Sequence, residues 1–111
     1  MESLSQWQGL LERVLQSYAD LPYPYRDVNT YVVVGREKKH FFLMHEGWQG
    51  SKRLHGIVVH AEIREGKIWI HYDGIEDSIT AELEASGVPK NKIVLAFHSP
   101  DIREHTGYAV V

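Results

Sequence analysis

Seven histidines in a chain of 111 residues make a metal site the first chemistry to consider. His60 and His71 form the strongest pair, because they face one another if the chain turns at Glu65-Gly66. Side chains directly opposite in two antiparallel strands have Cβ atoms about 4.5–5.5 Å apart, close enough for two imidazoles to share one Zn²⁺. A structural zinc site has four ligands and a catalytic site three, and the third here would be Glu62 or Asp73. We expect two neutral histidines on an amphipathic surface, with no metal and no cofactor.

Catalysis by a side-chain nucleophile has weaker support. An activated serine needs a histidine and an orienting carboxylate, and the local candidates are His98, Ser99, Asp101 and His105. No G-x-S-x-G motif surrounds Ser99, and its position before Pro100 is typical of a helix cap. The segment 35–39 lacks the second glycine and the hydroxyl of a phosphate-binding loop, and the chain has no cysteine. We expect no catalytic residues and no enzymatic activity.

The predicted hairpin that carries both histidines covers residues 55–73. Gly66 supplies the positive φ that a two-residue turn needs, between segments rich in β-branched and aromatic residues. One face of this hairpin is apolar and should lie on a core; it pairs Ile63 with Ile68, Ala61 with Ile70 and Val59 with Tyr72. The opposite face pairs Glu62 with Trp69 and His60 with His71. We expect this second face to look toward solvent, a ligand or another chain.

The N-terminal half supplies a helix and another hairpin. Apolar residues three and four apart predict a helix that begins at a Ser3 cap and ends near Asp20, followed by a stiff connector over residues 21–25. β-branched and aromatic residues predict strands over 29–34 and 40–45, joined by a charged turn. Trp48 lies between glycines after the second strand; a cover over an edge of the core is the favoured interpretation, and contact with a partner is the alternative.

The C-terminal third predicts a helix, a strand and a final turn. The residues from Asp73 to Glu76 resemble a capping box, and the helix that follows should end near Ser86, before Gly87-Val88-Pro89. A strand is expected over 93–97, and Ser99 should cap a short turn. The apolar end 108–111 should pack on the core or on a second subunit. This order of elements predicts one α+β domain over residues 1–111, with a largely antiparallel sheet of about five strands.

Composition restricts the partners. The formal net charge is −3, and acidic and basic residues are interspersed, so direct DNA binding is not favoured. The local exception is Arg36, Lys38, Lys39 and His40, a run typical of a solvated hairpin tip. No apolar run reaches the roughly 20 residues that span a bilayer, and the N-terminus lacks the features of a signal peptide. We expect a cytoplasmic protein that does not contact the membrane.

Taken together, several segments resemble the XisI family. They are Gly47-Trp48, HGIVVHAEI, GKIWI, DGIEDSI, GVPKNKIVLAFHSP and the residues from Ile102 through Thr106 to Val110. The family is known as the controlling factor for excision of the fdxN DNA element in photosynthetic, nitrogen-fixing bacteria, a process linked to heterocyst differentiation. The resemblance implies a small α+β protein without known enzymatic activity, which works alongside XisH, a protein resembling restriction-type nucleases. Recombination itself belongs to a separate recombinase.

The resemblance and the residues together favour a protein-binding accessory factor that acts on a XisH-like partner. The alternatives are a direct DNA-binding excision factor, an immunity-like partner of the XisH-like protein and, less favoured, a small metal-dependent hydrolase. We expect a homodimer whose DNA contact is indirect or weak. The expected partner-binding residues are Trp48, His60, Glu62, Trp69 and His71.

Overall fold

The computed structural model describes residues 4–21 and 27–111. In chain order its elements are α1 (Leu4–Ala19), β1 (Val28–Val34), β2 (His40–Gln49), β3 (Lys52–Arg64), β4 (Lys67–Asp73), α2 (Ile79–Ala85), the 3₁₀ turn η1 (Lys90–Lys92), β5 (Ile93–Leu95) and α3 (Pro100–Arg103). The strands form one sheet in the order β1-β2-β3-β4-β5. All neighbouring pairs are antiparallel except β4 and β5. The predicted α+β class and largely antiparallel five-stranded sheet are therefore confirmed.

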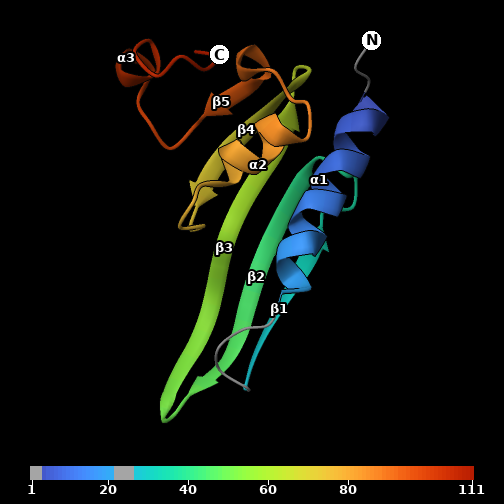
Figure 1. The fold of residues 1–111 in the computed structure, drawn as a ribbon, viewed down its shortest axis with the longest axis vertical. Helices are drawn as coiled ribbons and strands as arrows, with labels where there is room; N and C mark the ends of the chain where they lie inside the picture. Colours follow the sequence, from blue (N-terminus) through green and yellow to red (C-terminus); the bar gives the residue numbers. More distant parts are fainter. Residues whose placement is uncertain (1–3, 22–26) are drawn as a thin grey trace.

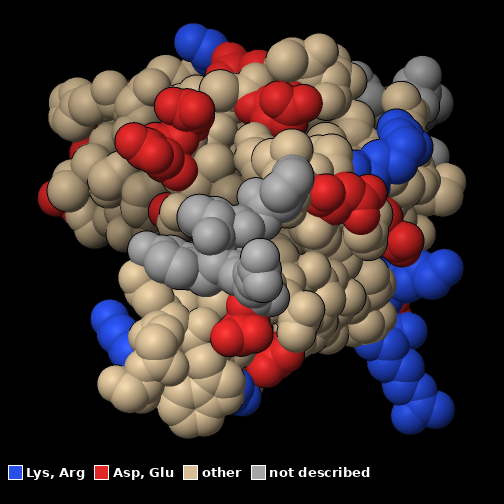
Figure 2. All heavy atoms as spheres, turned by 60° about the horizontal axis from the view of Figure 1, so that its bottom comes forward, with Lys and Arg blue, Asp and Glu red and all other residues tan. Residues whose placement is uncertain are grey.

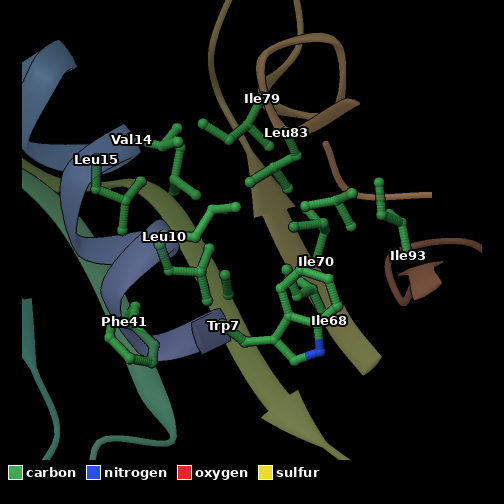
Figure 3. Close-up of a cluster of buried hydrophobic side chains, with 14 of the residues drawn as sticks. Trp7, Leu10, Val14, Leu15, Phe41, Ile68, Ile70, Ile79, Leu83 and Ile93 are labelled. Carbon is green, nitrogen blue, oxygen red and sulfur yellow. The ribbon is translucent and has the colours of Figure 1, made fainter. Parts of the chain in front are cut away.

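Helices α1 and α2 cover the same face of the sheet, and the core lies beneath them (Figure 1). The apolar stripe of α1 points into this core, where its side chains lie among those of β2, β4 and α2 (Figure 3). The Trp7 indole also donates a 3.2 Å hydrogen bond to the carbonyl of Gly66, which fixes the helix to the β3–β4 turn. The predicted helix is confirmed as far as Ala19, whereas the Ser3 cap and most of the connector lie outside the described residues. No helix in the described ranges is long and apolar enough to cross a membrane.

The β3–β4 hairpin turns at Glu65-Gly66, as predicted, with both residues at positive φ. Its four pairs nearest the turn have the predicted register. The register then shifts at a β-bulge, so that His60 pairs with Tyr72 and Val59 with Asp73. The predicted His60–His71 and Val59–Tyr72 pairs are wrong, because His71 is the extra residue of the bulge and strict alternation cannot anticipate an insertion.

Strand β2 is longer than predicted, since it continues through Trp48 to Gln49 instead of ending at His45. Gly47 allows this continuation. Its φ is 149°, and a Cβ atom there would lie 1.8 Å from the carbonyl oxygen of Asp27. The Trp48 amide donates to that same oxygen at 2.9 Å. The long hairpin of β2 and β3 therefore extends past both helices as an arm of the sheet (Figure 1).

Helix α2 begins later than predicted, at Ile79, with Ser78 as its N-cap. Asp73 still acts at this helix start, because its carboxylate accepts from the amides of Ile75 and Ile79 and from the Ser78 hydroxyl. The predicted capping box is therefore wrong in its position, as residues 74–78 form a loop that Asp73 organises. The predicted helix end is confirmed.

The C-terminal segment packs against its own chain. Strand β5 ends at Leu95, earlier than predicted, and α3 follows Ser99, whose side chain makes no capping bond although one was expected. The Tyr108 hydroxyl donates to Glu84 at 2.8 Å, and Ala109 forms a parallel bridge with Val94. The prediction that the chain end packs on the core is confirmed for Tyr108 and Ala109.

Candidate functional site: the open face of the sheet

The face of the sheet opposite α1 and α2 carries an aromatic and apolar surface. Because Phe41, Leu43, Val59 and Ala61 point into the core, their neighbours in the strands point the other way. We call this surface the open face; it consists of Tyr31, Val33, His40, Phe42, Met44, Trp48, Ile57, His60, Glu62, His71 and Tyr72. Five of these are large hydrophobic residues that are exposed: Tyr31, Val33, Trp48, Ile57 and Tyr72. Exposed apolar side chains gathered on one face in this way are typical of an interaction site.

Three histidines and one carboxylate form a connected group on the open face, beside Phe42. His40 Nδ1 and His60 Nε2 are 3.1 Å apart, and His71 Nε2 lies 2.8 Å from Glu62 Oε1. The rings of His60 and His71 have centroids 4.7 Å apart, and the ring of Phe42 stacks on His60 at 4.3 Å. The bulge therefore brings His60 and His71 together on the non-core side, as predicted, although they do not pair across the strands.

The pKa values of His60 and Glu62 within this group differ from those of isolated side chains. Burial lowers the pKa of His60, and the neighbouring His71 and His40 lower it further. Burial alone would raise the pKa of Glu62, but the hydrogen bonds from His71 and Arg64 outweigh it, and the pKa falls below its usual value. Folding thus favours the neutral form of the His60 imidazole and the ionised form of the Glu62 carboxylate. This arrangement presents hydrogen-bonding groups, but the described residues contain no group of three or more His, Asp or Glu placed to hold a metal ion.

Trp69 lies on the same side of the sheet, but it does not contribute to the exposed surface. Its side chain is 8% exposed, with the Arg64 guanidinium 4.0 Å and the Arg103 guanidinium 5.6 Å from its ring centroid. The expectation that Trp69 is exposed on this face of the hairpin is wrong, because α3 brings Arg103 over the indole. A contact between Trp69 and a partner stays a prediction.

Trp48 has the opposite surroundings. It is 48% exposed in the β2–β3 arm and is accompanied by the Arg53 guanidinium, 5.3 Å from its ring centroid. The expectation that it covers an edge of the core is wrong, because the arm extends beyond the helices that form the core.

Sequence reasoning missed part of the open face. Phe42 and Met44 alternate with the core residues Phe41 and Leu43, so the period of two in β2 was a signal that could have identified them. No such signal exists for Ile57 and Tyr72. Each lies beside a register shift, one in β3 and one in β4, and such a shift changes which side chains share a face.

Comparison with known proteins adds the family context. The family model described as XisI protein matches residues 1–110. A XisI-like protein from Anabaena variabilis ATCC 29413 is 33% identical, with a TM-score of 0.88, over 98% of this chain and 100% of that one. The fdxN element excision controlling factor XisI from the same organism is 28% identical, with a TM-score of 0.80, over 99% of this chain and 100% of that one. No curated protein matches the chain.

Proposed function

The chain belongs to the XisI family, and from this premise we propose that it controls the excision of a DNA element by binding another protein rather than by catalysis. The similarity to a protein named as an excision controlling factor supports the first part of this proposal. The composition of the open face supports the second. This face combines exposed aromatic rings with hydrogen-bonding groups, as protein interfaces do.

The proposed partner is a XisH-like protein of nuclease fold. We place its binding surface along the open face, from Trp48 in the arm to His60, Glu62 and His71 at the histidine group. Trp48 offers a large exposed ring, and the Glu62 carboxylate is held in a fixed orientation by His71 and Arg64. Trp69 would support this surface from within, because it holds Arg64 beside Glu62.

Binding of the purified chain to a purified XisH-like protein, measured by isothermal titration calorimetry, tests this proposal. If Trp48 is an anchor of the interface, Trp48→Ala should weaken binding by about 2 kcal/mol, roughly thirtyfold. Phe97→Ala is the matched control, since Phe97 is 48% exposed like Trp48 but lies outside the open face. Absence of binding by the wild-type chain would refute the proposed partner. Equal losses in both variants would refute the proposed surface.

A nuclease assay separates control from mere association. If the XisH-like protein cleaves DNA, the bound chain should change the rate of cleavage, and the chain alone should cleave nothing. Suppression of cleavage would indicate the immunity-like role, whereas a changed site or product would indicate control of excision.

Direct DNA binding is the competing function, and the basic tip between β1 and β2 is its best candidate. Glu37 lies 3.9 Å from Lys39 within this tip and partly offsets its charge. On the side of the molecule drawn in Figure 2, acidic and basic side chains lie among uncharged surface, some of them next to one another, and they form no broad basic patch. Electrophoretic mobility shifts in about 150 mM salt distinguish the two functions, because phosphate contacts weaken steeply as salt is raised. Strong, salt-dependent binding by the chain alone would favour this second function.

A further inference from the structure

Within residues 4–21 and 27–111, strand β1 is an edge strand without the features that usually protect one. In the sheet of the described residues it has a neighbour on one side only. Its sequence, VNTYVVV, contains no charge and no proline, and its seven pairs with β2 show no bulge. Natural proteins usually block such edges with charged residues, prolines, bulges or a covering segment, because free backbone groups pair readily with another strand.

The free backbone groups of β1 can be assigned to particular residues. The Asp27 carbonyl accepts from the Trp48 amide, and the Gly35 amide donates to the His40 carbonyl, so both of these odd-numbered residues bond toward β2. Alternate residues of a strand bond to opposite sides. Val28, Thr30, Val32 and Val34 therefore direct their N–H and C=O groups away from the sheet.

The other edge of the sheet is covered by the C-terminal segment of the chain. Beside β5, Ala109 forms a bridge with Val94, and its amide donates to the Ile93 carbonyl at 2.9 Å. The exposure of β1 is therefore a feature of one edge and not of the whole sheet.

We propose that β1 pairs with β1 of a second copy across a two-fold axis perpendicular to the sheet. Such an axis keeps side chains of opposing residues on the same face, and Tyr31 lies at the midpoint of the strand. Centred there, Thr30 pairs with Val32 and Val28 with Val34 of the other copy. These are the residues with outward-directed groups, so about eight backbone hydrogen bonds form.

The second copy is the occupant that best fits this edge. Every side-chain pair in the register is uncharged, so no like charges oppose one another. Along the edge, a groove of about 340 Å³ is lined by Val32 and Val34 and by Glu12, Arg13 and Gln16 of α1. The helix of the second copy would run antiparallel along the same seam, where each copy presents one acidic and one basic residue. A two-fold dimer is also the commonest assembly of small soluble chains.

This inference is independent of the proposed function. The axis places both open faces on the same side of the joined sheet, so the dimer would present the partner-binding surface twice. Failure of the dimer would leave the binding of one partner per chain intact.

Light scattering coupled to size-exclusion chromatography, at tens of micromolar protein, tests the proposal. Wild type should have twice the 12.8 kDa mass of the chain. Tyr31 forms a non-hydrogen-bonded pair with its own copy, in which side chains approach most closely. Tyr31→Lys and Tyr31→Glu should therefore each raise the dissociation constant of the dimer roughly tenfold or more, because like charges oppose one another. An equimolar mixture of the two variants should regain the dimer mass.

Two further measurements keep the test specific. Tyr72→Lys places the same charge on the open face in β4, away from the edge, and should leave the dimer intact. Circular dichroism should show that all three variants are folded. A monomeric wild type, a monomeric Tyr72→Lys variant or a mixture that fails to recover the dimer would each overturn the proposal.

Discussion

Trp69 and Trp48 lie on the same side of one sheet, yet one is structural and the other is available for contacts. Trp69 has the guanidinium groups of Arg64 and Arg103 near its ring, whereas Trp48 has that of Arg53 and is 48% exposed. The difference comes from the last part of the chain, which folds over β4 and β5 but does not reach the β2–β3 arm. The sheet thus has a closed end, where Trp69 is buried, and an open end, where the proposed binding surface exposes Trp48.

The largest expected effect is the difference in stability between the variants that truncate the two tryptophans. Trp69→Ala should lower the free energy of unfolding by about 3 kcal/mol, because it removes a large buried ring and leaves a cavity. Trp48→Ala should change it by less than about 0.5 kcal/mol, because an exposed ring loses little. Urea denaturation of both variants measures the difference. Equal losses would remove the distinction between the two ends of the sheet.

Arg103 should have the next largest effect, since it holds the closing segment in place. Its guanidinium donates to the carbonyls of His98, Ala96 and Val110 and lies over Trp69. Arg103→Ala should cost about 1–2 kcal/mol of stability and should expose the indole of Trp69. Tryptophan fluorescence would then shift to longer wavelength and become easier to quench.

Arg103→Lys is the matched control, because it keeps the charge but not the fork of donors. It should give an intermediate stability. If Arg103→Ala leaves both the fluorescence and the stability unchanged, the closing segment does not depend on this side chain, and another contact must close that end.

The sequence predicted the architecture well where the alternation of side chains, the turn residues and the residues that end a helix lie close together in the chain. The turn at Glu65-Gly66, the end of α2 just before Gly87 and the helix α1 all depend on residues close in the chain. The errors have a common physical origin, because they depend on distant contacts. Arg103 covers Trp69 from 34 positions away, and two bulges, in β3 and β4, change which residues share a face. The histidine pair was predicted correctly as neighbours, but the geometry that joins them required the bulge at His71.

The smallest expected effect lies at His60, on the boundary between the two ends of the sheet. Folding lowers its pKa below the ordinary value of 6.5, through burial first and through His71 and His40 next. As the pH falls through 6.5, the unfolded chain therefore takes up a proton before the folded chain does, and stability decreases. The contribution is fully present above pH 6.5 and is lost as the pH falls through the lowered pKa. Glu62, whose pKa is also lowered by folding, adds a loss of the same sign at more acidic pH, below 4.5.

His60→Phe isolates this contribution, because phenylalanine keeps a ring stacked on Phe42 but cannot take up a proton. Urea unfolding at pH 7.5, 6.5 and 5.5 should show a shallower loss of stability for this variant than for wild type. Parallel curves would mean that His60 has the same pKa in the folded and unfolded chain. A shallower curve for His60→Phe would show that protonation of His60 destabilises the folded chain, so binding measurements on the open face are best made above pH 6.5, where this destabilisation is absent.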